Sequence, residues 1–506
     1  MGKHSVTGSR SAIASATDPA EPTVGPDSTR AARNTASLLI SRVAIAAMGW
    51  AGSLLIARTL SPDDFGAFSL VFGILGLMAI VTDLGVGRVV LGDLVKTDQD
   101  ASSDLAGSFV LLRLALGLVG YVVAVVFVVV ADYSAEIVRA TLIGGLVVVI
   151  ATPSHALSVI YQSRLRMTYV SAIESASQFV QLALTVAAVL WAPYLLILVL
   201  PAVANEVVAI VLKIRGIRRG VTGAAPRFHH VLRFWKPMLV EAIPLSIGFA
   251  LIQATAKIDV LMLSKLDNLN SVGLYTVGYK FSDFVTIAGV AVSTPFMTVM
   301  VASWPGNARA FTNASRRAIG IVAGLGGLGI TIFWPCATEL IGGLYGARFA
   351  EAALATKLLV IGAVLAGVSQ IALLALVSAG KHRQYPWLAL FALALNVCLN
   401  LYFIPRFSYT GAAWVTLITE VVAVVAVTCL VAAVIPFRGV IPITRSLSCA
   451  ALAAALIAGG SAAQHYWDVS WIACTIGGGV LYVVVAYILR ITDDLGVPRW
   501  RGSLRR

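Results

Sequence analysis

The stretch LSPDDFGAFSLVFG, residues 60–73, lies between two long apolar runs, and a related stretch, LDNLNSVGLYTVGY, follows at residues 266–279. Each copy begins with a leucine and a short polar loop and then reaches a glycine. Two aromatic residues follow that glycine with the same spacing, Phe68 and Phe72 in the first copy and Tyr275 and Tyr279 in the second. The repetition predicts that one hairpin between two membrane spans is present twice.

The composition of the chain is that of an integral membrane protein. Of its 506 residues, 59% are hydrophobic and 12% are charged, and the mean hydropathy is +0.90. Apolar runs of roughly 20 residues, long enough to cross a hydrocarbon core, recur along almost the whole chain. Only helices fit that pattern, so the sequence predicts an all-α membrane protein with about fourteen spans. The predicted spans are 36–57, 66–90, 106–131, 137–160, 170–191, 193–212, 238–262, 273–299, 316–338, 353–379, 385–404, 410–434, 444–463 and 469–489.

The topology follows from the loops. A very tight hairpin is expected at Trp191–Tyr194, because merging its two spans would invert everything downstream. Lys and Arg concentrate on the cytoplasmic side of short loops. With a cytoplasmic N-terminus the inner loops carry most of these residues, and the outward loops carry only Arg58, Lys265, Arg348 and Arg406. The net charge of +13 therefore reflects topology with both termini in the cytoplasm, and no nucleic acid is needed to explain it.

A second internal echo supports duplication. NEVVAIV at residues 205–211 resembles TEVVAVV at residues 419–425. Spans one to six and seven to twelve are thus expected to form two pseudo-symmetric six-helix bundles, the architecture of alternating-access carriers, with two added spans. The expected divisions are a disordered cytoplasmic tail (1–34), the first bundle (35–212), a basic cytoplasmic linker (213–237), the second bundle (238–434), two additional helices (435–490) and a basic tail (491–506).

Charged residues inside spans are costly and need either an escape to the headgroups or a use. Arg42 and Arg113 lie about two turns inside their spans, where snorkelling and lining a cavity are equally open readings. Asp83 could neutralise either arginine as a buried pair. It is also a candidate for ion coupling.

The second bundle carries more such charges. Lys280 and Asp283 are three residues apart, hence on one helical face and able to pair. Lys257 and Asp259 lie near the outer end of their span, and Glu420 is the deepest acid in the chain. We expect Asp259, Asp283 and Glu420 to serve in proton or cation coupling, with a self-satisfied ion network as the alternative for each.

Signals for chemistry are missing from the sequence. No GxxxxGK[ST] loop for phosphate occurs, and the loops are too short for a soluble catalytic domain. The five cysteines lack CxxC spacing and resemble small core residues. We therefore expect transport, with no enzymatic activity, no cofactor and no metal site.

Several stretches together resemble the polysaccharide transporter family, the Wzx-type lipid-linked oligosaccharide flippases of the multidrug, oligosaccharidyl-lipid and polysaccharide exporter superfamily. They extend across residues 36–490. The stretches are SLLISRV (37–43), ARTLSPDDFGAFSL (57–70), KIDVLMLSKLDNLNSVGLYTVGYKFSDF (257–284), the pair Asn396 and Asn400, Ile404-Pro405, and GAAWVT (411–416).

The resemblance implies a V-shaped pair of bundles that flips a polyprenyl-pyrophosphate-linked oligosaccharide across the inner (plasma) membrane for cell-surface polysaccharide biosynthesis. Ser41-Arg42 matches the Ser-Arg at the start of the first span of the related lipid II flippases, which makes Arg42 the first candidate for substrate contact. Arg113, Lys257 and Lys280 follow on depth and charge alone, since arginine and lysine can hold a pyrophosphate.

The expected partners are the lipid-linked oligosaccharide and membrane lipid, with glycosyltransferases or a polymerase of the same pathway as further candidates. Two alternatives remain open. One is a multidrug or organic-cation antiporter of the same superfamily, which would need a more acidic cleft. The other is a membrane-embedded polysaccharide polymerase or ligase, which would need larger outward loops than this chain offers.

Overall fold

The computed structural model describes residues 26–83, 85–96, 99–223, 225–228, 231–381, 385–437 and 439–489, and within these residues it is helical, with no β-strand. The first half contains α1 (Pro26–Thr59), α2 (Pro62–Asp83), α3 (Val86–Lys96), α4 (Gln99–Val130), α5 (Ala135–Gly144), α6 (Leu146–Ser163), α7 (Met167–Trp191) and α8 (Leu195–Arg218). The second half contains α9 (Val231–Leu266), α10 (Leu269–Ser303), α11 (Ala308–Tyr345), the short 3-10 helix η1 (Ala347–Ala352), α12 (Ala353–Ser378), α13 (Tyr385–Val434), α14 (Ile443–Trp467) and α15 (Trp471–Ile488).

The helices confirm the predicted all-α membrane fold. Twelve helical stretches of the described chain are long and apolar enough to cross a membrane. That number counts α13 once, although it contains two predicted spans, and it omits α9, which contains the predicted span 238–262. Adding both brings the count to the expected fourteen. The tight hairpin is also confirmed, because α7 ends at Trp191 and α8 begins at Leu195.

Several boundaries differ from the sequence-based expectation. The predicted span 66–90 is two helices, since α2 ends at Asp83 and α3 begins at Val86. The helix α1 begins at Pro26, so it includes residues that the sequence had placed in the tail 1–34. The earlier part of that tail, and the predicted basic tail 491–506, lie outside the described residues.

The chain reverses direction inside α13. Ser408, which follows Pro405, has a positive φ of 55° that no regular helix adopts. Asn400 and Thr416 stand at equal distances on either side of Ser408, yet both hydrogen-bond Asp259. The two halves of α13 are therefore neighbouring antiparallel helices, as the sequence predicts for spans eleven and twelve.

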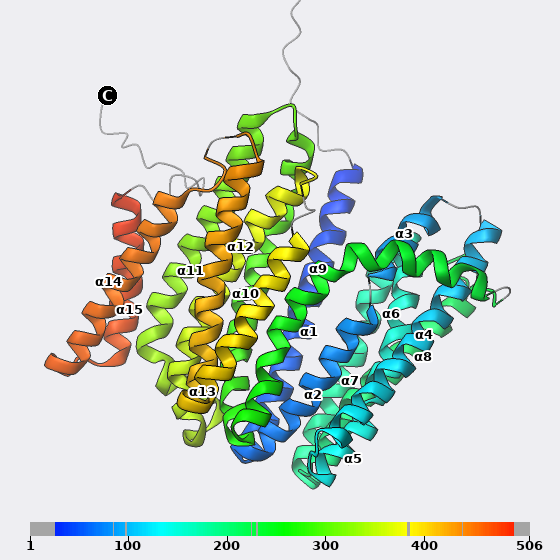
Figure 1. The fold of residues 1–506 in the computed structure, drawn as a ribbon, viewed down its shortest axis with the longest axis horizontal. Coiled ribbons are helices and arrows are strands. Elements are labelled where there is room, and N and C mark those ends of the chain that lie inside the picture. The colour runs from blue at the N-terminus through cyan, green and yellow to red at the C-terminus, as the bar shows by residue number, and fades with distance from the viewer. Residues whose placement is uncertain are drawn as a thin grey trace, which may run out of the picture.

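The helices form two lobes, and a further pair of helices packs against the outside of one lobe (Figure 1). Helices α1 to α8 pack with one another in one lobe, the second half of α9 together with α10 to α13 forms the other, and α14 and α15 pack against α11 at its edge. Helix α9 joins the lobes. Its first half contributes Met238 and Ala242 to the core around Phe109 of the first lobe, and its second half contributes Val260 and Leu263 to a core shared by both lobes.

The repeated hairpins begin their second helices in the same way. In the first copy the backbone N–H of Asp64 donates to Ser61 Oγ over 3.1 Å, and that hydroxyl donates to the Asp64 carboxylate over 2.7 Å. In the second copy the N–H of Ser271 donates to Asn268 Oδ1 over 2.9 Å. The short polar loop in each repeat is therefore a helix N-cap, and it satisfies backbone donors that a helix start leaves free.

The structure shows why each repeat has a glycine at this position. A Cβ on Gly66 would overlap the carbonyl oxygen of Leu269, and a Cβ on Gly273 would overlap that of Pro62. Each hairpin thus packs its helix start against the glycine of the other hairpin. We call the end of the molecule that carries these turns the hairpin end, and the opposite end, where α8 ends and α9 begins, the terminal end.

Candidate functional site

A pocket of about 260 Å³ lies between the lobes, and we call it the central pocket. Helices α1, α2 and α7 line it from the first lobe, and α9 and α10 line it from the second. The second lobe contributes its charges, namely Lys257, Lys280 and Asp283, and the first lobe contributes the amides Gln178 and Gln181. The structure therefore brings three of the predicted site residues to one place.

These charges are not joined to one another by short contacts. The described residues contain two ion pairs within 4.0 Å, and neither includes Lys257, Lys280 or Asp283. The predicted pairing of Lys280 with Asp283 is therefore absent from this conformation. Two cations and one anion give the pocket an excess of positive charge, and both ammonium groups remain able to bind an anion.

Three glycines are among the residues with which the first lobe lines the central pocket. Gly49, Gly52 and Gly73 line it. Next to it, a Cβ on Gly76 would lie 3.8 Å from the Cε atom of Lys257. Because these glycines have no side chain, they leave room for a ligand beside the lysines of the other lobe.

Asp259 lies beside the central pocket in a buried polar network. Its side chain is only 1% exposed. The carboxylate accepts hydrogen bonds from Tyr275 Oη (2.7 Å), Asn400 Nδ2 (2.7 Å) and Thr416 Oγ1 (3.0 Å), and the Tyr279 hydroxyl lies 3.5 Å away. No Lys, Arg or His of the described chain lies within ion-pair distance of it.

A buried carboxylate without a cation is unfavourable unless it takes a proton or binds an ion. Oxygen atoms suited to a hard cation surround it. Asn400 donates to Asn396 Oδ1 over 3.0 Å, while its own Oδ1 is buried and has no hydrogen-bond partner. The network can therefore take up a proton at Asp259 or a monovalent cation among these oxygens.

Arg113 and Asp83 form a separate ion pair in the first lobe, in which the arginine is buried and the Asp83 side chain is 52% exposed. Arg113 Nη1 lies 2.7 Å from Asp83 Oδ1, and the arginine is 2% exposed. Its nitrogens also donate to the carbonyl oxygens of Thr82, Asp83 and Thr152. The reading of Asp83 as the counter-charge of an arginine thus holds for Arg113. Because these bonds occupy its guanidinium, Arg113 is not free to hold a substrate in this conformation.

A second buried cation of the first lobe was missed by sequence reasoning. The sequence places Lys213 at the start of the expected linker 213–237. In the structure it is 1% exposed and lies inside α8. Its Nζ atom donates to Ser154 Oγ over 3.0 Å and lies 3.7 Å from Glu174 Oε1. The helix continues six residues beyond the predicted end of span six, which carries this lysine into the lobe.

Two further candidates stand outside the lining of the central pocket. Arg42 is exposed on α1, about 9 Å along the helix from the lining residue Met48 and toward the terminal end. Glu420 is half-buried and faces α12, where its Cγ would lie 3.9 Å from a Cβ on Gly362. Within the described chain Glu420 makes no hydrogen bond or ion pair.

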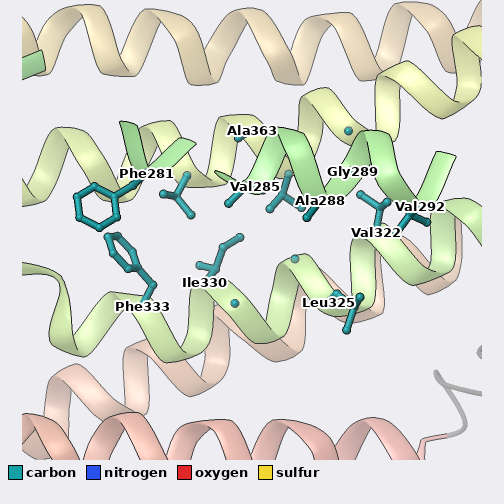
Figure 2. Close-up of a pocket in the computed structure, with 15 residues that line it drawn as sticks. Phe281, Val285, Ala288, Gly289, Val292, Val322, Leu325, Ile330, Phe333 and Ala363 are labelled. Atoms are coloured by element: carbon teal, nitrogen blue, oxygen red, sulfur yellow. The ribbon is translucent and has the colours of Figure 1, made fainter. Parts of the chain in front are cut away.

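An apolar pocket of about 270 Å³ lies between α10, α11 and α12 (Figure 2). All of its lining residues are hydrophobic or glycine. Phe281 and Phe333 stand together at one end, with ring centroids 5.4 Å apart. Lys280 and Phe281 are consecutive on α10, so this helix presents charge to the central pocket and apolar side chains to the second pocket.

The partners of Asp259 were present in the sequence without an assigned role. Asn396 and Asn400 are four residues apart, which places both on one helical face. Tyr275 is part of the repeated hairpin. Its counterpart in the first copy, Phe68, is apolar, and this difference between the copies could have marked Tyr275 as a functional residue. Only the fold shows that Tyr275 and Asn400 bind the same carboxylate.

The family of the chain is shown by comparison with family models. The model described as polysaccharide biosynthesis protein matches residues 31–301, which is more than half of the chain. The chain belongs to this family. No sequence of a curated protein matches this family member significantly.

Solved structures show which fold the family member has. A lipid II flippase MurJ in an inward closed conformation matches with a TM-score of 0.74 over 90% of this chain and 99% of that chain, at 13% identity. An inward-facing multidrug resistance MATE transporter of the MOP superfamily matches with a TM-score of 0.63 over 78% of this chain and 98% of the other, at 14% identity. An outward-facing structure of a multidrug resistance MATE transporter matches with a TM-score of 0.57 over 78% of this chain and 94% of that chain, at 14% identity. The chain therefore has the fold of these membrane transporters.

Proposed function

We propose that this protein is a flippase that moves a polyprenyl-pyrophosphate-linked oligosaccharide across the plasma membrane by alternating access. The observation that carries the proposal is the two-faced helix α10, with Lys280 toward the central pocket and Phe281 toward the apolar pocket. A lipid-linked glycan has the same division between an anionic head and an apolar tail. A helix that offers both environments side by side fits such an amphiphile.

The head group is assigned to the central pocket. Lys257 and Lys280 supply charge for a pyrophosphate, and the amides of Gln178 and Gln181 suit sugar hydroxyls. Arg42, exposed toward the terminal end, is proposed as a first contact for the head on its way in. The inner loops are the basic ones, so the terminal end is proposed to face the cytoplasm.

Ion coupling is assigned to Asp259, with Glu420 and Asp283 as further acids. Asp259 is buried, lacks a cation in the described structure, and reaches α10 and both halves of α13 through its hydrogen bonds. Protonation or cation binding there would change how these helices hold together. That link between charge state and packing is what a coupled carrier requires.

The test is glycolipid analysis of cells depleted of the protein, asking on which leaflet a lipid-linked oligosaccharide builds up. The proposal predicts that the complete oligosaccharide accumulates on the cytoplasmic leaflet. Restoring the wild-type chain should clear it, and the double variant Lys257→Gln, Lys280→Gln should not, at equal membrane abundance. Accumulation of exported but unpolymerised units would indicate a polymerase instead, and an unchanged glycolipid pool would favour the drug antiporter.

A further inference from the structure

Four basic residues are exceptions to the concentration of Lys and Arg in the inner loops. They are Arg58, Lys265, Arg348 and Arg406. Short outward loops of a membrane protein are usually poor in Lys and Arg. The structure places the first three of these residues at the hairpin end, where the turns of the two lobes meet. Their contacts at the hairpin end account for this exception.

Arg58 and Arg348 each bind backbone carbonyl oxygens of the opposite lobe. Arg58, in the last turn of α1, donates from Nε to the Leu344 carbonyl oxygen over 2.5 Å and from Nη2 to that of Gly343. Both carbonyls belong to the last turn of α11, where helix acceptors have no partner within the helix. Arg348, in η1, donates in return to the carbonyl oxygen of Arg58.

Lys265 makes a third contact of the same kind. It stands in the last turn of α9, and its Nζ atom donates to the carbonyl oxygen of Ala131, directly after the end of α4. The same Nζ atom lies 3.6 Å from the centroid of the Tyr133 ring. Cations favour helix C-termini because the partial charge there is negative. Each of the three cations thus binds a helix C-terminus of the opposite lobe.

The Tyr133 hydroxyl reinforces the Lys265 contact. It lies 2.7 Å from Ser264 Oγ, and because Ser264 itself donates to the Leu261 carbonyl oxygen, Tyr133 is the donor. Burial raises the pKa of Tyr133, so its phenol keeps the proton that this bond needs.

Arg406 differs from the other three. Its Nη1 atom donates to the Tyr402 carbonyl oxygen over 3.0 Å, and its guanidinium carbon lies 3.8 Å from the centroid of the Tyr402 ring. Both contacts stay within one turn of α13. The structure therefore supplies a matched control: an outward cation of the same chemistry that does not join the lobes.

We propose that Arg58, Arg348 and Lys265 form a gate that holds the hairpin end shut while the central pocket is open to the terminal end. Every one of these bonds depends on contact between the lobes, and separation of the hairpin ends breaks all of them together. The three side chains are exposed, so water replaces the lost partners at little cost. Such a gate closes by several weak contacts and can reopen, as a carrier cycle requires.

This inference rests on the proposed alternating-access cycle, but its test does not depend on the substrate. Spin labels would be placed at Glu136 of the first lobe and Glu351 of the second, both exposed near the hairpin end, in full-length protein whose native cysteines are replaced. The population of long distances between the labels would be measured in lipid nanodiscs. Arg58→Gln, Arg348→Gln and Lys265→Gln should each raise the ratio of separated to joined hairpin ends about threefold, the effect of losing one solvent-exposed charged contact. Arg406→Gln should leave the ratio unchanged.

An unchanged distance distribution in all three variants, or an equal shift in Arg406→Gln, would overturn the gate. Thermal unfolding of each variant controls for general damage, and Arg58→Lys should restore part of the joined population. The two proposals fail separately. If the distances shift but no lipid-linked glycan moves, the gate stands and the substrate assignment fails, whereas normal flipping with unshifted distances removes the gate alone.

Discussion

At five aligned positions in and near the central pocket, the second lobe carries polar or charged residues where the first lobe carries phenylalanine or glycine. The two hairpin glycines, Gly66 and Gly273, are 207 residues apart, and the same offset aligns the flanking helices. The aligned pairs are Gly52 with Asp259, Phe68 with Tyr275, Phe72 with Tyr279, Gly73 with Lys280, and Gly76 with Asp283. At these five pairs the two lobes share a scaffold position and differ in the chemistry of the side chain.

This difference assigns unequal work to the lobes. The second lobe holds the buried acid Asp259 and the lysines of the central pocket, and the first lobe leaves the space that a ligand needs. In the first lobe the buried cations Arg113 and Lys213 lie next to Asp83 and Glu174 of the same lobe. We therefore expect substitutions in the second lobe to change transport, and aligned substitutions in the first lobe to change it only where they alter the pocket.

The largest effect is expected from Asp259→Asn. An amide of the same shape neither carries the negative charge nor takes up a proton, so gradient-driven transport should fall about 100-fold, the upper end for losing a charged hydrogen-bonding partner. Transport into proteoliposomes would be compared with and without an imposed sodium or proton gradient. Substrate binding and membrane abundance should stay near wild type. A variant that keeps full gradient dependence would remove Asp259 from the coupling site.

An intermediate effect is expected when the first lobe is given the acid of the second. Gly76→Asp would place a carboxylate beside Lys257, because a Cβ at this position already lies 3.8 Å from the lysine Cε. The new ion pair would compete with an anionic head group and weaken binding about tenfold, as expected for one partly screened charge contact. Binding of a lipid-linked pyrophosphate in detergent would measure this loss.

The matched control for that variant is Gly76→Ala. Its methyl group fits at ordinary contact distance, so affinity should change little. Equal weakening by alanine and by aspartate would mean that space, and not the charge of Lys257, decides binding.

The smallest effect is expected from exchanging the aligned aromatic residues. Tyr275→Phe removes one hydrogen bond from Asp259 and leaves those of Asn400 and Thr416, so transport should fall about fivefold. The reverse change in the first lobe, Phe68→Tyr, adds a hydroxyl to the lining of the central pocket but meets no acid, since Gly52 stands at the position of Asp259, so it should lower transport less than Tyr275→Phe does. Rates of flipping in parallel preparations would compare the two. Equal losses would contradict the division of work between the lobes.

The sequence predicted the spans, the tight hairpin at Trp191–Tyr194 and the repeat, because long apolar runs and a duplicated pattern are local signals. It did not predict that Gly66 and Gly273 pack against each other's hairpins, since this contact depends on how two distant segments meet. For the same reason, the pairing of Arg113 with Asp83 was one of several options, and the burial of Lys213 went unnoticed. The cations at the hairpin end were recognised as exceptions, but their partners are backbone carbonyls, which leave no trace in a pattern of side chains.

The most direct test of the central claim is a flipping assay with purified protein in liposomes that contain a polyprenyl-pyrophosphate-linked oligosaccharide. A membrane-impermeant enzyme that modifies the sugar would report how much of the lipid reaches the outer leaflet. We expect rapid exposure with the wild-type protein, and little with the double variant Lys257→Gln, Lys280→Gln at equal reconstitution. Equal exposure with the wild type and the double variant would contradict the assigned pocket, and no protein-dependent exposure, together with exchange of a small organic cation, would contradict the flippase itself.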